Sequence, residues 1–211
     1  QLVAEWARLL KESWKTTQAT LGGFALTIII GIPLAMLIAY SKLIESYVYP
    51  LLVFSQSIPK VAIAPLFVVW FGFGIVPKII SAFLLGFFPV VVSTVMGFKS
   101  VEPDMLDLAR SMGASRLQTF FKISLPQALP AIFSGLKVSI TLAVVGAVVG
   151  EFVGSNSGIG YVLQVATGNF DLPLMFAALV VLSSIGVVLF MVVDLVERLM
   201  IPWHPSQNQI L

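Results

Sequence analysis

The sequence predicts an all-α, polytopic membrane protein. Of its 211 residues, 58% are hydrophobic and only 10% are charged, whereas soluble domains carry about 25% charged residues. The mean hydropathy is +1.02, and the apolar residues gather in five long stretches. Stretches of about 20 apolar residues have the length of membrane-spanning helices. We therefore expect one domain of several packed transmembrane helices.

Composition excludes several functions. The formal net charge is only +2, so the chain offers no basic surface for nucleic acid. It has no cysteine, one histidine (His204) and no Walker A loop, which argues against thiolate metal sites and against ATP binding in that manner. The glycine-rich run 154–160 lacks the strand and helix of a dinucleotide-binding motif, and we interpret it as a loop. We expect a non-enzymatic chain without a metal or cofactor of its own.

The first elements are an amphipathic helix and a span. Residues 1–19 place leucines and tryptophans at helical spacing among charged residues, which predicts an interfacial helix too charged to cross a membrane. Residues 20–40 are an uncharged run of 21 residues and predict the first span. Small residues suited to close helix contact lie along it at Gly22, Gly23, Gly31, Ala35 and Ala39.

The second span, residues 49–70, contains Pro59 and Pro65 and carries Lys60 near its centre. Proline removes a backbone donor, and broken helices at membrane depth commonly line a cavity. The candidate translocation path is therefore formed by Gln56, Ser57, Pro59 and Lys60. The lysine would attract an anionic solute. Equally, Lys60 can extend toward the interface or pair with a helix C-terminal carbonyl, and both interpretations remain open.

Three further spans follow at residues 79–98, 132–149 and 172–193, so that residues 20–198 form the transmembrane domain. Lys137 is expected to anchor its helix near the inner interface rather than to line the path. We interpret residues 150–171 as a loop, which contains no lysine or arginine, and residues 199–211 as a polar tail.

Residues 102–126 are the most informative polar segment. Lipid cannot host its six charged residues, Glu102, Asp104, Asp107, Arg110, Arg116 and Lys122. Asp104 after Pro103 can cap a short helix, which Gly113 would end. Ser115 with Gln118 then matches a capping box that opens a second helix. The sequence predicts two short helices joined at a glycine elbow and held outside the bilayer.

This segment resembles a known signature: E-A-A, three residues, G, nine residues, then I-x-L-P. The residues in this chain are Asp107, Leu108, Ala109, Gly113 with Ala114 beside it, Ile123, Leu125 and Pro126. Asp replaces Glu conservatively, and Leu108 departs from the first alanine. The signature belongs to the integral-membrane permease subunits of binding-protein-dependent type I ABC importers. In that family the segment is the coupling helix, which docks on the ATP-hydrolysing subunit. The alternative is an ordinary amphipathic interfacial loop.

Other stretches extend the resemblance over nearly the whole chain. SIPKVAIAPLFVVWFGFG, SVEPDMLDLARSMGAS and GEFVGSNSGIGYVL resemble the nitrate/sulfonate/taurine-type subfamily, which also carries bicarbonate, pyrimidine precursors and flavins, so the solute stays open. The resemblance implies a five-helix type I core in the bacterial inner membrane, working as a homodimer. Its partners would be an ABC ATPase subunit that binds the ATP and an extracytoplasmic solute-binding protein. It also implies a further span before Gln1.

Glu151 and Asn156 lie in the stretch that such a binding protein would approach. Glu151 is either an external gate or binding-protein contact, or a structural residue that caps a helix or pairs with Lys78. We favour the structural role. Asn156 is a candidate contact for the same partner.

Charge distribution sets the expected orientation. One side collects six basic residues, Lys42, Lys99, Arg110, Arg116, Lys122 and Arg198, and the other collects four, Arg8, Lys11, Lys15 and Lys78. The positive-inside rule places the 102–126 segment in the cytoplasm. The main rival function is an ATPase-independent secondary transporter or channel, which would need carboxylates within spans or inverted repeats. A scaffold or insertase subunit is a third class.

Overall fold

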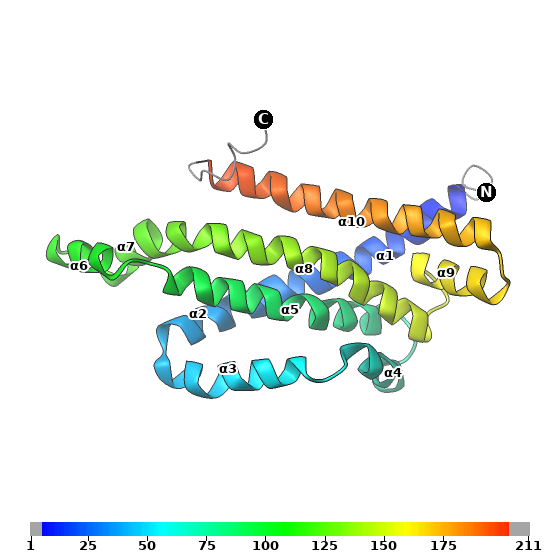
Figure 1. Cartoon of the computed structure of the whole chain (residues 1–211), viewed down its shortest axis with the longest axis horizontal. Helices are drawn as coiled ribbons and strands as arrows, with labels where there is room; N and C mark the ends of the chain where they lie inside the picture. Colours follow the sequence, from blue (N-terminus) through cyan, green and yellow to red (C-terminus); the bar gives the residue numbers. More distant parts are fainter. Residues whose placement is uncertain (1–5, 203–211) are drawn as a thin grey trace.

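A computed structural model describes residues 6–202, and in this range every regular element is a helix. The helices lie roughly along one long axis (Figure 1). In chain order they are α1 (Trp6–Leu26), the π-helical turn η1 (Thr27–Gly31), α2 (Ile32–Tyr40), α3 (Lys42–Gln56), α4 (Lys60–Phe71), α5 (Ile75–Lys99), α6 (Pro103–Ser111), α7 (Arg116–Thr119), the π-helical turn η2 (Phe120–Ser124), α8 (Leu125–Gly154), α9 (Ile159–Gly168) and α10 (Leu172–Met200).

Within residues 6–202, four helical segments are long and apolar enough to cross a membrane, and a bent pair makes a fifth. The expected five-span, all-α architecture is thereby confirmed. One boundary differs, because α1, η1 and α2 form a single helix of 35 residues, Trp6–Tyr40. From Trp6 onward, the helix expected over residues 1–19 is continuous with the first span, and residues 1–5 lie outside the described range.

The second span is broken where Pro59 predicts a break. Helices α3 and α4 meet at an angle of 94°. Pro59 adopts an extended conformation before α4, and it has no N–H to continue the helical ladder. Pro65 behaves differently from the expectation, because it lies inside α4 without ending it. Proline at that position deprives only the carbonyl of Val61 of its partner, and the helix continues to Phe71.

Helices α5 and α8 form the centre of the bundle and approach each other closely along their length. A Cβ added at Gly146 of α8 would lie 2.5 Å from the carbonyl oxygen of Ser81, and one at Gly97 of α5 would lie 2.9 Å from that of Ala128. Only glycine permits these backbone approaches. Helix association in lipid depends on such close van der Waals contact, because burial from water does not drive it there.

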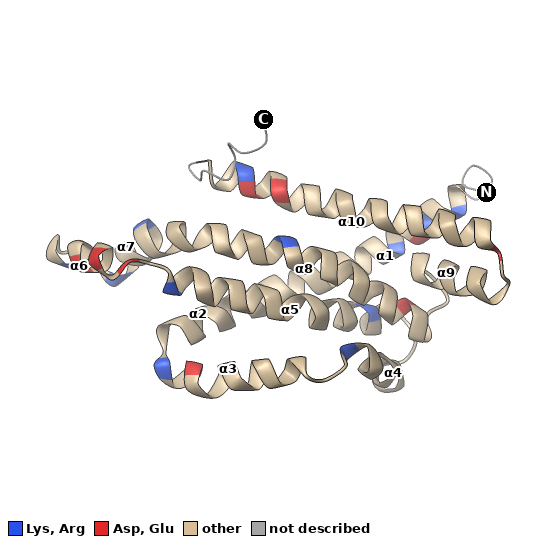
Figure 2. Cartoon of the chain, viewed as in Figure 1, with Lys and Arg blue, Asp and Glu red and all other residues tan. Residues whose placement is uncertain are grey.

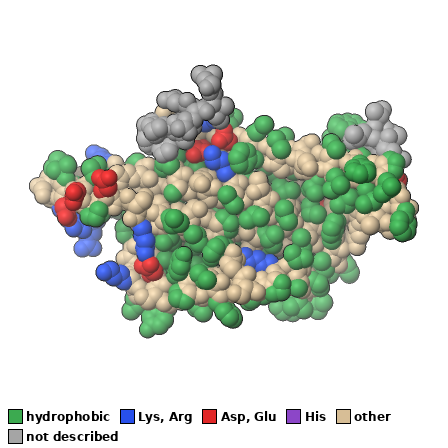
Figure 3. All heavy atoms as spheres, viewed as in Figure 1, with side chains coloured by type: hydrophobic (Ala, Val, Ile, Leu, Met, Phe, Trp, Pro, Cys, Tyr) green, Lys and Arg blue, Asp and Glu red, His purple; other side chains and the backbone are tan. Residues whose placement is uncertain are grey.

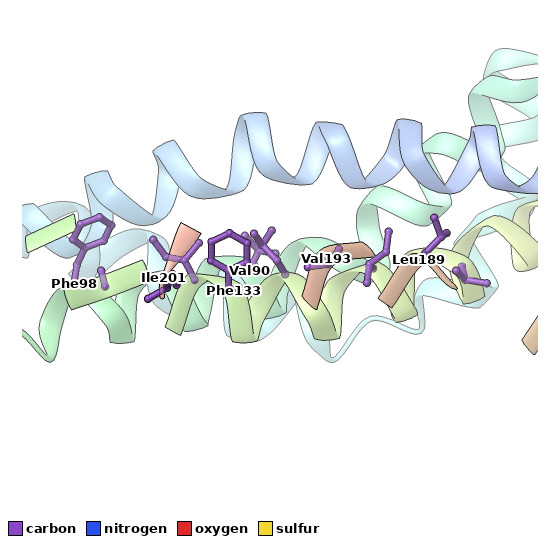
Figure 4. Close-up of a cluster of buried hydrophobic side chains, with 11 residues drawn as sticks. Val90, Phe98, Phe133, Leu189, Val193 and Ile201 are labelled. Carbon is purple, nitrogen blue, oxygen red and sulfur yellow. The ribbon is translucent and has the colours of Figure 1, made fainter. Parts of the chain in front are cut away.

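Apolar side chains from α5, α8 and α10 join in the largest buried cluster (Figure 4). Phe98, Phe133 and Val193 represent the three helices, and Ile201 closes the cluster with 1% of its surface exposed. The polar tail expected from residue 199 therefore begins later, because α10 continues to Met200 and Ile201 packs inward. Residues 203–211 lie outside the described range.

Two other boundaries differ from expectation. The stretch 150–171, read as a loop, contains the ten-residue helix α9, whose Ile159 and Val162 pack into a second apolar cluster. The fourth span is also longer than expected, because α7, η2 and α8 form one continuous helix of 39 residues. Both stretches hold glycines or polar residues that weaken local helical patterns, and tertiary packing overrides that weakness.

The bundle has two chemically distinct ends. Charged side chains gather at one end around α6 and α7, and hydrophobic side chains dominate the visible middle (Figures 2 and 3). An ion pair between Lys99 and Glu45 ties the end of α5 to the start of α3 at that same end. At the opposite end, Thr16 of α1 contacts Glu151 of α8. The two contacts thus hold helices together at opposite ends of the bundle.

Candidate functional site

The elbow expected at Gly113 is present. Helix α6 ends in a Schellman motif: the N–H of Gly113 donates to the carbonyl of Arg110 at 2.9 Å, and the N–H of Ala114 donates to that of Ala109 at 3.0 Å. Gly113 has φ of +75°, in the left-handed region, and a side chain there would meet no atom within 4 Å. The glycine is thus required by backbone conformation and not by space.

The second short helix begins as expected. Ser115 accepts a hydrogen bond from the N–H of Gln118, and the Gln118 side chain accepts one from the N–H of Ser115, which completes a capping box. The first helix begins differently from the expectation: its N-cap is Glu102, no side chain caps it, and Asp104 lies within its first turn. Asp104 there still complements the positive end of the helix.

The elbow connects directly to the transmembrane bundle. Ile123 lies in the π-helical turn η2, and Leu125 and Pro126 begin α8, so no flexible linker separates the 102–126 segment from the fourth span. Aromatic contacts brace this junction. Phe120 stacks on Phe98 of α5, with ring centroids 5.9 Å apart, and both rings contact Tyr40 at the end of α2. A force on the elbow would therefore reach three transmembrane helices.

The outward surface of this segment is unexpectedly apolar. Met105 and Leu108 lie on α6 and Met112 is its C-cap, at helical spacing, whereas Leu117 lies on α7 and Phe121 on η2. Exposed fractions reach 72% at Met112 and 70% at Leu117. The ion pair between Asp107 and Arg110 is itself exposed, and such pairs contribute little stability. We call these five apolar residues the knob face. The sequence analysis did not identify this surface, although Met105, Leu108 and Met112 have the i, i+3, i+7 spacing of one helix face.

The signature residues divide between two sides of the segment. Asp107 and Leu108 are exposed, whereas Ala109 is 1% exposed and Ala114 is half-buried. Ile123, Leu125 and Pro126 are half-buried at the start of the long helix. The exposed signature residues are therefore accessible to a partner, whereas the buried and half-buried ones pack within the protein.

The four candidate path residues lie together at the α3–α4 bend. Gln56 ends α3, Ser57 caps it and Pro59 precedes Lys60, the first residue of α4. The Lys60 ammonium donates to the Gln56 side-chain carbonyl across the break. Gln56, Ser57 and Pro59 are exposed and Lys60 is half-buried. The bend thus presents a small set of polar groups on an otherwise apolar pair of helices.

The opposite end of the bundle holds a buried polar cluster centred on Glu151, and we call it the outer cluster. Glu151 has no exposed surface, and its carboxylate lies 3.6 Å from the ammonium of Lys78, which is 4% exposed. The expected alternative of a Lys78 pair is confirmed. The carboxylate also accepts hydrogen bonds from the Thr16 hydroxyl at 2.9 Å and from the N–H of Gly160 at 2.8 Å. Four helices meet in this cluster.

The loop between α8 and α9 wraps around the outer cluster. The N–H of Gly158 donates to Glu12 at 2.6 Å, and that of Ile159 donates to the Thr16 hydroxyl. Lys78 donates to the Ser157 carbonyl at 2.8 Å. Sequence reasoning missed Glu12 and Thr16, because they lie more than 130 residues from the loop.

Asn156 is exposed beside the outer cluster. It lines a cavity of about 240 Å³ with Lys15, Gln18 and Lys78. The role of Asn156 toward a docked protein stays a prediction, as does any gating by Glu151. The burial of Glu151 means that a docked partner would act on it through this loop.

Lys137 lies against α10 and not at the α3–α4 bend. Its ammonium lies 3.0 Å from Asp194 and also pairs with Glu197, while Arg198 pairs with Asp194 at 2.8 Å. These side chains are between 13% and 50% exposed. The network joins α8 to the C-terminal part of α10, and the position of Lys137 near the inner interface stays a prediction.

The fold matches a solved transporter. The structure of the MetNI methionine ABC transporter in an inward-facing conformation superposes with a TM-score of 0.75 at 20% identity, over 94% of this chain and 97% of that one. The helices of residues 6–202 therefore have the fold of a type I ABC importer permease.

The chain belongs to the family described as the binding-protein-dependent transport system inner membrane component, which matches residues 28–202. The formylaminopyrimidine transport permease protein ThiX of Halalkalibacterium halodurans is 41% identical over 88% of this chain and 74% of that protein. The riboflavin transport system permease protein RibX of Chloroflexus aurantiacus is 39% identical over 94% and 74%. The putative aliphatic sulfonates transport permease protein SsuC of Bacillus subtilis is 35% identical over 87% and 67%.

The resemblance drawn from the sequence is thereby confirmed. The chain is a multi-pass permease of the bacterial inner membrane, in the type I ABC importer family. Its relatives carry names that refer to different solutes, so membership of the family does not select one.

Proposed function

We propose that this permease imports a small solute with energy from a separate ABC ATPase subunit, which docks on the 102–126 segment. The observation that carries the proposal is the knob face, an exposed apolar surface on a braced elbow. Surfaces of this kind mark protein contacts. The elbow continues into α8 without a linker, so movement of a docked subunit would be transmitted to the bundle.

In this mechanism the ATPase subunit biases a two-state membrane element. Closure of an ATPase dimer would bring two elbows together and turn the bundles from inward-open to outward-open. The mechanism requires a second permease copy, and we propose a homodimer. An extracytoplasmic binding protein would deliver the solute at the end that carries the outer cluster, with Asn156 and the loop around Glu151 as contacts.

For the path, we propose the polar groups at the α3–α4 bend. Lys60 and Gln56 form a donor and acceptor pair where the helix is broken, and backbone groups at such breaks are free to contact a solute. The ammonium favours an anionic solute. Sulfonates and taurine carry an anionic sulfonate group at one end, and nitrate is itself a small anion. The names of ThiX and RibX keep pyrimidine and flavin solutes open.

A co-purification experiment tests the docking. The tagged permease is isolated with its native partners, and an ATPase subunit with a P-loop should accompany it. Leu108→Asp should abolish this association, because a charge would be desolvated at the centre of the contact. Ser111→Asp is the matched control, because it introduces the same charge at an exposed position of α6 that is already polar. Retention of the ATPase by Leu108→Asp would refute the docking surface.

Transport itself is tested in proteoliposomes. Uptake should require ATP and the ATPase subunit together. Solute movement by the permease alone, without nucleotide, would instead support a secondary transporter or channel.

A further inference from the structure

A cavity lies where the 102–126 segment meets the end of α2, and none of the five knob-face residues lines it. Its volume is about 590 Å³, and it opens between the end of α2 and the elbow. The lining residues are Tyr40, Leu106, Arg110, Ala114, Arg116, Thr119, Phe120 and Ser124. Leu106 and Arg110 lie one helical turn apart on α6, on a face different from that of Met105, Leu108 and Met112. The segment therefore has two surfaces with different chemistry.

The polar half of this cavity suits a phosphate. Two guanidinium groups, Arg110 and Arg116, line it together with the hydroxyl-bearing side chains of Tyr40, Thr119 and Ser124. Arg110 pairs with Asp107 on its own helix, whereas Arg116 has no acidic partner among residues 6–202. Guanidinium groups bind phosphate oxygens in a bidentate manner, and the hydroxyls of Tyr40 and Ser124 can supply additional donors, whereas that of Thr119 donates to the Ser115 carbonyl.

The other half of the cavity suits a lipid. An apolar wall is formed by Phe120, Leu106 and the ring of Tyr40. Phe120 also stacks on Phe98 of α5. Tyr40 ends the first span and is 60% exposed, as expected for a tyrosine at the boundary between hydrocarbon and water. A soluble anion would use the guanidinium groups but not this wall.

We propose that the cavity binds the head group of an anionic phospholipid from the inner leaflet, with its phosphate on Arg110 and Arg116. Basic pockets beside transmembrane helices on the cytoplasmic side hold such head groups. The lipid would brace the elbow against α2. The proposal rests on the chain's place in the membrane and not on the docking of the ATPase.

Native mass spectrometry of the full chain in mild detergent tests it. Phosphatidylglycerol, phosphatidylcholine and inorganic phosphate are the probes. Phosphatidylglycerol should be retained about tenfold more strongly than phosphatidylcholine. The double variant Arg110→Gln/Arg116→Gln should reduce its retention about tenfold. Lys122→Gln, which removes a positive charge from an exposed residue outside the cavity, should leave it unchanged.

A second variant separates charge from geometry. Arg116→Lys keeps the charge and loses the planar fork, so retention should fall between those of the parent and the double variant. Thermal unfolding of each variant without added lipid checks that the fold is intact.

Three outcomes would overturn the proposal. Equal retention by the parent and the double variant would place the lipid elsewhere. Binding of inorganic phosphate that displaces phosphatidylglycerol would assign the cavity to a soluble anion. Loss of the ATPase subunit from the double variant, with lipid retention unchanged, would assign it to the subunit contact. Loss of lipid retention with the ATPase still bound would support the lipid site and leave the docking surface intact.

Discussion

The carboxylate of Glu151 and the ammonium of Lys78 lie 3.6 Å apart, and both side chains are almost completely buried. Such a pair is costly to assemble, because both groups lose their hydration. Here the cost is offset by hydrogen bonds from Thr16, from the N–H of Gly160 and to the carbonyl of Ser157. The pair fixes the outer ends of α1, α5, α8 and α9 relative to one another.

Removal of one member of this pair should destabilise the protein strongly. Lys78→Met leaves the Glu151 carboxylate buried without its cation, and we expect a loss of about 3 to 5 kcal/mol in the free energy of unfolding. Glu151→Gln should lower the free energy of unfolding by a similar amount. The double variant should cost clearly less than the sum, because neither charge is then left unpaired. Denaturant unfolding in detergent measures all three, and simple additivity would show that the two groups act independently.

Gly158 should not tolerate a side chain. A Cβ there would lie 1.9 Å from an oxygen of Glu151, and its φ of +105° is unfavourable for other residues. Gly158→Ala should therefore lower stability by roughly 2 to 4 kcal/mol, through strain and displacement of the carboxylate. Gly168→Ala is the matched control, because a Cβ at that glycine of α9 meets nothing within 4 Å. Comparable thermal unfolding of the two variants would contradict the packing around Glu151.

Gly113→Arg should separate folding from coupling. The position has open space, so a side chain fits, but φ of +75° costs a non-glycine residue about 1 to 2 kcal/mol. The elbow would relax and transmit less movement. We expect normal membrane insertion, with ATP hydrolysis no longer linked to uptake. Gly113→Asn, which tolerates the left-handed region, should restore most transport.

The comparison of Gly113→Arg with Gly113→Asn gives the decisive measurement, namely the ratio of solute imported to ATP hydrolysed. Unchanged uptake by Gly113→Arg would count against the elbow as the coupling element.

Lys60→Met should reduce transport far more than stability. The lysine is half-buried and contacts Gln56 across a helix break, so its removal leaves no buried charge unpaired. We expect the free energy of unfolding to change by less than about 1 kcal/mol. Uptake of an anionic solute should fall about tenfold or more, whereas Lys42→Met at the start of α3 should have little effect. If uptake persists, Lys60 has a structural role.

Several features of this protein were readable in the sequence because they depend on local chemistry. The left-handed Gly113, the Ser115–Gln118 capping box and the break at Pro59 each follow from the conformational limits of one or two residues. Helix α9 and the continuation of α8 into η2 were not readable, because packing and not local preference stabilises them.

By itself, then, the sequence determined that the chain crosses a membrane several times, breaks at Pro59 and turns at Gly113. Length, apolarity and backbone freedom are properties of single segments. Only the tertiary structure decided that Glu12 and Thr16 meet the loop around Glu151, and that Arg110 and Arg116 face a cavity beside Tyr40. Those arrangements depend on how whole helices pack, and packing is set by the close contact of residues far apart in the chain.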